Sequence, residues 1–182
     1  MEQKNIKKIV VIGPESTGKT TLCQNLAHHF NTLWVPEFAR EYLEVHGKEY
    51  TLDDLEKIAA GQLALEDEIT LKLQTQLPKA SCLLIDTDMY VMKVWSEYVF
   101  GQCSPFILEA IAERSYDLYL LCDVDVPWVK DDLREYPDEE PRIELFAIYK
   151  DILIHQQTPW QIISGSYAER NEKAIQAVRS IL

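Results

Sequence analysis

Residues 13–21 read GPESTGKTT, and this stretch decides the fold. It matches the spacing G-x-x-x-x-G-K-[ST], with Gly13, Gly18, Lys19 and Thr20 at the fixed positions. The residues just before it, KKIVVI, form an apolar, strand-like run, and those that follow, TTLCQNLAHHF, have helical spacing. A strand, a glycine-rich turn and a helix in this order predict a loop whose backbone N–H groups bind phosphate at the start of a helix.

The residue types in this loop suit a nucleoside triphosphate. Glycine permits backbone angles that turn successive N–H groups inward. We expect Lys19 to bridge the β- and γ-phosphates and the hydroxyl of Thr20 to bind Mg²⁺, while neighbouring hydroxyls add further hydrogen bonds. The predicted ATP-binding residues of the loop are Gly13, Glu15, Ser16, Thr17, Gly18, Lys19, Thr20 and Thr21.

Composition narrows the class of protein. The chain has 182 residues, 47% of them hydrophobic, which predicts one globular domain over residues 1–182. Its net charge of −12 argues against nucleic acid and anionic membranes as partners. The four cysteines include no CxxC pair, which favours reduced thiols in the cytosol. Because the N-terminal apolar run is too short for a signal peptide or a membrane span, we expect a cytoplasmic protein without membrane insertion.

Apolar runs alternate with helical patterns along the whole chain. The runs predicted as strands are residues 8–12, 33–35, 82–86, 118–123 and 160–164. Buried strands separated by helices predict an α/β fold, with a five-stranded parallel sheet and helices on both faces. Thr51 and Asp54 form a capping box at the start of the longest predicted helix. The charged segment 126–144 departs from this pattern; it predicts a small lid at about 127–142, with a solvated acidic loop as the alternative.

Acidic residues follow the second and third predicted strands, at the edge where open α/β sheets bind ligands. Glu37 is predicted to hold a substrate hydroxyl, with Arg40 on the same helical face; a helix-start glutamate paired with Arg40 is the alternative. Asp86 follows four apolar residues, and we expect it beside the phosphate loop, where it binds Mg²⁺ or accepts the proton of the alcohol. Asp88 either contacts a substrate ribose or caps the next helix. The choice between Glu37 and Asp86 as the base stays open.

Four blocks of sequence, GPESTGKTTL, PEFAREYL, LLIDTD and WVKDDLR, occur in the order found in the nicotinamide riboside kinase domain that NadR proteins carry after an adenylyltransferase. The resemblance covers nearly the whole chain. It implies a three-layer P-loop kinase fold with ATP and Mg²⁺ as cofactors. It also implies transfer of the γ-phosphoryl group to the 5′-hydroxyl of nicotinamide riboside, giving nicotinamide mononucleotide. Because the chain is short and contains no HxGH-type motif, we expect the kinase module alone.

The resemblance also implies site residues. The predicted catalytic residues are Lys19, Glu37, Asp86 and two lid arginines, Arg134 and Arg142. The predicted substrate-binding residues are Trp34, Glu37, Arg40, Gln62 and Asp88. Related domains can carry a tryptophan directly before the strand-two glutamate; this chain has Pro36 there, and Trp34 two residues earlier. At the adenine end we expect Ser166, Tyr167 and Arg170, with an ordinary strand–helix connection as the alternative.

Two other functions stay open at this point. One is another nucleoside or nucleotide kinase, such as a deoxynucleoside kinase. The other is a non-enzymatic ATP-binding module that regulates a partner. The predicted ligand beside ATP is a small-molecule nucleoside, and a homo-oligomer is left open.

Overall fold

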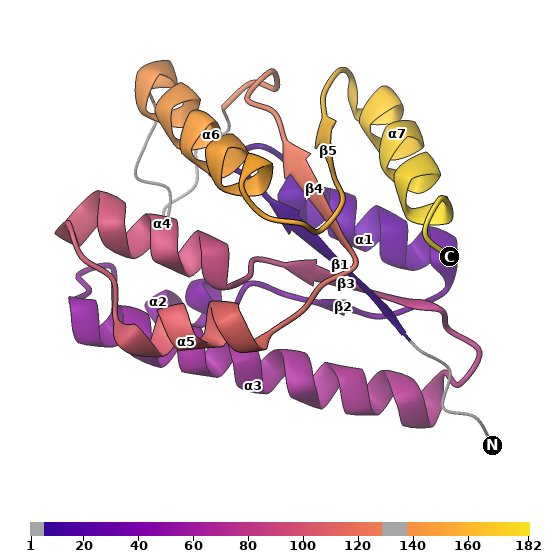
Figure 1. Cartoon of the computed structure of the whole chain (residues 1–182), viewed down its shortest axis with the longest axis horizontal. Helices are drawn as coiled ribbons and strands as arrows, with labels where there is room; N and C mark the ends of the chain where they lie inside the picture. The colour runs from indigo at the N-terminus through magenta and orange to yellow at the C-terminus, as the bar shows by residue number, and fades with distance from the viewer. Residues whose placement is uncertain (1–5, 129–137) are drawn as a thin grey trace.

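The computed structural model describes residues 6–128 and 138–182. Its centre is a parallel sheet of five strands in the order β2-β3-β1-β4-β5 (Figure 1). The strands are β1 (Lys7–Ile12), β2 (Trp34–Val35), β3 (Cys82–Asp86), β4 (Leu118–Cys122) and β5 (Trp160–Ile163). The five predicted strands are thus confirmed, each within one residue of its predicted ends.

The strands read as continuous apolar runs because both faces of the sheet are buried. On β1, Ile9 and Val11 pack into the core on one face, whereas Val10 and Ile12 pack into the core on the other. All four of these side chains are fully buried. The sheet therefore forms the middle of three layers, as the sequence predicts.

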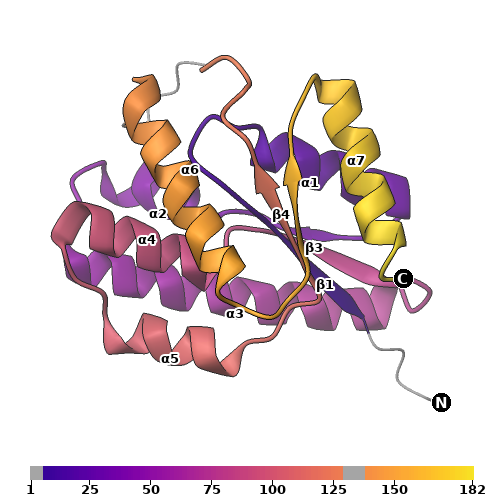
Figure 2. The same cartoon turned by 45° about the horizontal axis from the view of Figure 1, so that its top comes forward.

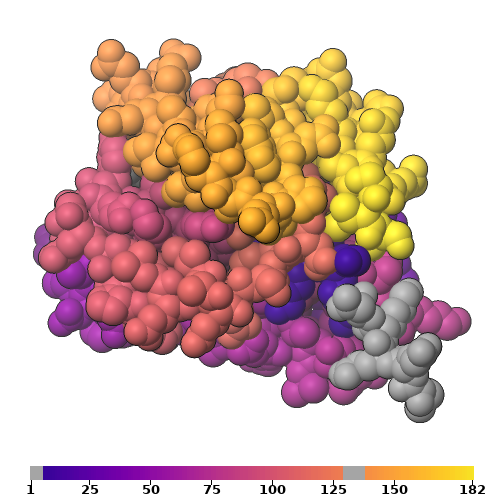
Figure 3. Space-filling model, viewed as in Figure 1, coloured from indigo at the N-terminus to yellow at the C-terminus, as the bar shows by residue number. Residues whose placement is uncertain are grey.

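Helices cover both faces (Figure 2). On one face lie α1 (Lys19–Phe30) and α7 (Tyr167–Arg179). On the other face lie α3 (Leu52–Gln76), α4 (Met89–Phe100) and α6 (Glu139–Ile154). Two shorter helices, α2 (Phe38–His46) and α5 (Pro105–Glu113), pack with α3 and α4 around a third apolar cluster. Figure 3 shows that helices α4 to α7, in the second half of the chain, make up most of the surface on the viewed face.

Local sequence accounts for where these helices begin. The predicted capping box of α3 is present: the Thr51 hydroxyl accepts a hydrogen bond from the Asp54 amide, and the Asp54 carboxylate accepts one from the Thr51 amide. At α4, the carboxylate of Asp88 accepts hydrogen bonds from the amides of Tyr90 and Val91. None of the described helices is long and apolar enough to cross a membrane.

The predicted lid falls mostly outside the described residues. Residues 129–137, with Arg134, are not described. Of the predicted lid at about 127–142, residues 139–142 belong to α6, which begins at Glu139. Arg142 therefore lies in a helix, where it is buried and its Nη2 donates a hydrogen bond to the carbonyl oxygen of Val126 at 3.4 Å.

Candidate active site

The phosphate loop joins β1 to α1 and depends on its two glycines. A Cβ on Gly13, whose φ is +141°, would lie 2.7 Å from the carbonyl oxygen of Cys122 on the neighbouring strand β4. Gly18 adopts a left-handed φ of +79° and precedes α1 without a side-chain cap. Because glycine has no side chain, the first amides of α1 are not capped from the Gly18 position. Uncapped amides at the start of a helix bind anions.

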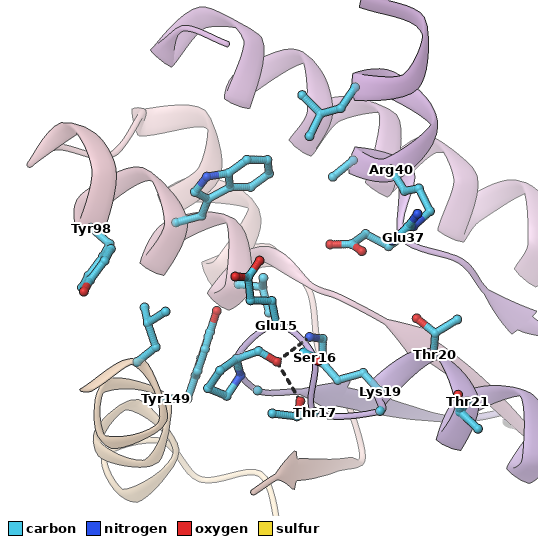
Figure 4. Close-up of a pocket in the computed structure, with 18 residues that line it drawn as sticks. Glu15, Ser16, Thr17, Lys19, Thr20, Thr21, Glu37, Arg40, Tyr98 and Tyr149 are labelled. Carbon is cyan, nitrogen blue, oxygen red and sulfur yellow. Dashed lines mark hydrogen bonds between the residues drawn. The ribbon is translucent and has the colours of Figure 1, made fainter. Parts of the chain in front are cut away.

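Hydrogen bonds from side chains of the loop itself and of α7 hold the loop in its conformation. The Thr17 hydroxyl and the Lys19 ammonium group both donate hydrogen bonds to the carbonyl oxygen of Pro14, at 2.7 and 2.9 Å (Figure 4). From α7, the buried Arg170 guanidinium donates to the carbonyl oxygen of Thr17 at 2.6 Å and to the Asp125 carboxylate at 2.8 Å. The loop conformation is thereby tied to the C-terminal helix.

Thr20 and Asp86 form a pair of hard oxygen ligands beside the loop. The Thr20 hydroxyl donates a hydrogen bond of 2.5 Å to one oxygen of the Asp86 carboxylate. The other carboxylate oxygen of Asp86 is buried and has no hydrogen-bond partner in the part of the chain that the structure describes. Burial, and then the negative charge of Glu37, raises the pKa of Asp86 above its ordinary value. A bound cation would relieve both penalties.

These two residues fit Mg²⁺, which is held in proteins by one or two carboxylates together with phosphate and water oxygens. No group of three or more His, Cys, Asp or Glu side chains suited to a metal occurs within residues 6–128 and 138–182. A metal at Thr20 and Asp86 would therefore take the rest of its coordination from phosphate and water oxygens.

A cavity of about 230 Å³ opens over the loop. Glu37 and Arg40 lie on one side of it and Tyr98 and Tyr149 on the other, with Glu15 of the loop between them (Figure 4). Its apolar wall comes from α2, α4 and α6, and consists of Ala39, Leu43, Val91, Trp95 and Leu145 beside the two tyrosines. The cavity thus joins a phosphate-binding loop, a carboxylate and aromatic side chains in one space.

The aromatic wall is fixed by its own contacts. The Trp95 indole N–H donates a hydrogen bond to the Tyr50 hydroxyl at 2.8 Å, and the two rings meet edge to face with centroids 4.9 Å apart. Tyr149 is 5% exposed. Tyr98 and Tyr149 are not among the site residues predicted from the sequence. The available signal was helical spacing, because Trp95 and Tyr98 are three residues apart on one face of α4.

Comparison with known proteins places the chain in a family. A family model described as an AAA domain matches residues 8–170. The chain belongs to this AAA domain family. It is also homologous to NadR, and the resemblance seen in the sequence is confirmed. The fold likewise matches that of P-loop kinases.

The curated relatives of this AAA domain include two trifunctional NAD biosynthesis/regulator proteins NadR. The protein from Escherichia coli K12 is 28% identical over 182 residues, which are 97% of this chain and 43% of the relative. The protein from Salmonella typhimurium LT2 is 33% identical over 133 residues, or 71% of this chain and 31% of the relative. The chain therefore spans less than half the length of the curated relatives it matches.

Solved structures give the same picture. A crystal structure of NadR in complex with NR matches with a TM-score of 0.79 and 28% identity, over 97% of this chain and 49% of that one. NadR in complex with NAD and AMP-PNP matches with a TM-score of 0.74 and 27% identity, over the same shares. A thymidylate kinase from Ehrlichia chaffeensis, at 14% identity and a TM-score of 0.66, covers 96% of this chain and 99% of its own and supports the fold alone.

Three residues of this AAA domain that were predicted to bind substrate are not among the described residues that line the cavity. Trp34 packs against the core cluster under α1. Gln62 on α3 binds the main chain beside Glu37. Asp88 caps α4 and accepts a hydrogen bond of 2.8 Å from the Tyr119 hydroxyl, so its capping alternative is the one that the structure supports.

The predicted adenine-end residues lie around the loop and α7. Ser166 caps α7 in a capping box with Glu169. Tyr167 is 57% exposed, and its ring lies 3.8 Å from the position that a Cβ on Gly18 would take. Arg170 binds the loop backbone directly. Arg142 does not line the cavity, and we do not assign it a catalytic role.

Proposed function

We propose that this chain is an ATP-dependent kinase that phosphorylates the 5′-hydroxyl of nicotinamide riboside and forms nicotinamide mononucleotide. The observation that carries the proposal is the single cavity that joins the phosphate loop, the Glu37 carboxylate and the aromatic wall. The homologous NadR structures, one with NR and one with NAD and AMP-PNP, support a nucleoside kinase with an ATP site.

On the nucleotide side, the amides at the start of α1 and the ammonium group of Lys19 would bind the β- and γ-phosphates. Thr20 and Asp86 would hold Mg²⁺, which when bound neutralises charge on these phosphates. Tyr167, exposed beside Gly18, would border the nucleoside part of ATP.

On the acceptor side, we assign the catalytic carboxylate to Glu37. Glu37 lines the cavity, whereas Asp86 is fully buried and bonded to Thr20. The 5′-oxygen of the nucleoside forms a bond to the γ-phosphorus while the bond from that phosphorus to the β–γ bridging oxygen breaks, and ADP leaves. The hydroxyl proton passes to the Glu37 carboxylate. Lys19 and the loop amides stabilise the charge on the transferred group.

The aromatic wall would bind the pyridinium ring of the acceptor, because a cation is attracted to the face of an aromatic ring. We expect Trp95→Leu, which keeps an apolar side chain but removes the π face, to raise the KM for nicotinamide riboside about tenfold. The KM for ATP and kcat should stay close to wild type. Steady-state kinetics with each substrate varied in turn would measure this.

A matched control for this variant is Lys93→Ala, on the same helix and outside the described lining of the cavity. It should change neither KM. Equal increases of both KM values in Trp95→Leu would contradict a specific contact with the ring.

A panel of nucleosides tests the proposed function. The purified chain is incubated with Mg·ATP and nicotinamide riboside, ribonucleosides or deoxynucleosides, and the product is identified by ³¹P NMR. We expect kcat/KM for nicotinamide riboside to exceed that for each neutral nucleoside by at least about tenfold, the order of one cation–π contact. Preference for a deoxynucleoside would replace the proposal by another nucleoside kinase. ATP binding without transfer to any acceptor would replace it by a regulatory module.

A further inference from the structure

We infer that Gln62, in the middle of α3, is a positioning residue that sets the direction of the Glu37 side chain. Its carboxamide oxygen accepts a hydrogen bond from the Phe38 amide at 2.7 Å. Its carboxamide nitrogen donates one to the carbonyl oxygen of Pro36 at 3.2 Å. Because Glu37 acquires its role from the proposed function, this role of Gln62 rests on that function too.

The two hydrogen bonds act on the backbone of Glu37 from both sides. The Pro36 carbonyl belongs to the peptide unit before the Cα atom of Glu37, and the Phe38 amide belongs to the unit after it. When both peptide planes are held, the direction of the Cα–Cβ bond between them is fixed. Gln62 is 2% exposed, so water does not compete for these contacts.

The Glu37 carboxylate extends into the cavity and does not cap its own helix. Glu37 precedes the first residue of α2 in an extended conformation, with φ −70° and ψ 110°, and its side chain makes no capping hydrogen bond. A side chain that caps a helix from this position accepts hydrogen bonds from the amides of the second or third helical residue. Glu37 makes no such bond, and its carboxylate points into the cavity, while Gln62 binds the amide of the first helical residue, Phe38 (Figure 4).

The residue before Gln62 holds the same turn. A Cβ on Gly61 would lie 2.1 to 2.5 Å from three ring atoms of Phe38, so the ring packs directly on the backbone of α3. Glycine inside a helix costs about 1 kcal/mol relative to alanine. The packing of Phe38 gives a reason for glycine at this position. Two consecutive residues of α3 thus hold the backbone and the ring of Phe38, which follows Glu37.

Gln156 provides a matched control, because it makes the same kind of contact far from the site. Its carboxamide nitrogen donates to the carbonyl oxygens of Leu153 and Thr158 at 3.1 and 2.7 Å, and its oxygen accepts from the Thr158 amide at 2.6 Å. This turn leads into the amino end of β5, whereas the phosphate loop follows the carboxyl end of β1, at the other end of the parallel strands. A purely structural role predicts the same outcome for both glutamines.

The test replaces each glutamine by methionine, which keeps the length of the side chain and removes the hydrogen bonds. We expect Gln62→Met to lower kcat about 30-fold, since a misplacement of about 1 Å can cost about 100-fold. The KM for ATP should stay within about twofold, because the phosphate loop is untouched. Gln156→Met should keep the wild-type kcat. Gly61→Ala should lower kcat as well, by about tenfold, because it displaces the Phe38 ring.

A second measurement does not depend on activity. Amide hydrogen exchange by NMR should show the Phe38 amide protected in the wild-type chain and in Gln156→Met, and exchanging at least about tenfold faster in Gln62→Met. Wild-type protection of the Phe38 amide in Gln62→Met would overturn the role of Gln62. So would a wild-type kcat in Gln62→Met under conditions where Glu37→Gln is inactive. A wild-type chain that phosphorylates no nucleoside would instead overturn the proposed function, and the exchange rates would still decide whether Gln62 holds the turn.

Discussion

Glu37→Gln is expected to lower kcat for phosphorylation of nicotinamide riboside by about a thousandfold, within the range that a positioned general base contributes. The carboxamide has nearly the shape of the carboxylate and can still bind the substrate hydroxyl, but it cannot accept its proton. Binding of AMP-PNP, measured by calorimetry, should stay within about threefold of wild type, because Glu37 precedes α2 and is not part of the loop that would bind the phosphates.

Glu41→Gln is the control for charge alone. Glu41 lies one turn further along α2, is exposed, and is not among the described residues that line the cavity. Its replacement removes a charge of the same sign four residues further along the chain and should leave kcat unchanged. If Glu37→Gln kept the wild-type kcat and Asp86→Asn lost it, Glu37 would not be the base, and the proton acceptor would be assigned to Asp86.

The strands and the phosphate loop could be predicted because their signals are local. Buried parallel strands are apolar throughout, and the loop needs glycines, a lysine and a hydroxyl at fixed spacing. The cavity wall could not be predicted in this way. Tyr98 and Tyr149 are brought together from α4 and α6, which are separated in sequence by a strand and a further helix. Their meeting depends on how these helices pack on the sheet.

Trp34 and Gln62, which were predicted to bind substrate but do not line the cavity, show the same limit of prediction from sequence. Successive side chains on a strand point to opposite faces, so Trp34 packs into the core on the α1 side while Val35 packs into the core on the other side. The sequence indicates this alternation but not which face of the sheet borders the cavity. Gln62 lies on the predicted apolar face of α3, where a buried amide needs partners. That its partners are the peptide groups around Glu37 follows only from the tertiary structure.

Asp88 and its neighbour show how backbone conformation limits prediction. Thr87 has a φ of +82°, which is unusual for a β-branched residue. This conformation lies between Asp86, which binds Thr20, and Asp88, which caps α4. A regular strand would place the side chains of Asp86 and Asp88, two residues apart, on the same face. The turn at Thr87 separates them.

Glu66 is a buried charge that sequence reasoning did not identify. It lies on α3, one turn beyond Gln62, and is 1% exposed. Its carboxylate accepts hydrogen bonds from the Lys8 ammonium group at 2.6 Å and from the Tyr116 hydroxyl at 3.0 Å. The Arg114 guanidinium lies 3.6 Å away. The carboxylate therefore connects α3 to the start of β1 and to the segment that leads into β4.

Glu66→Ala is expected to lower the free energy of unfolding by about 3–5 kcal/mol, the range found when one partner of a buried charge network is removed. The loss leaves Lys8 and Tyr116 without their acceptor in a site that water reaches poorly. Urea denaturation at pH 7, followed by circular dichroism, would measure it. Asp67→Ala is the matched control: Asp67 is the next residue and binds Arg114 through two hydrogen bonds of 2.5 and 2.8 Å, but its side chain is 60% exposed. Solvent screens that pair, so its removal should cost less than about 1 kcal/mol. Equal decreases in the free energy of unfolding in the two variants would mean that burial does not determine how strongly these charged contacts stabilise the fold.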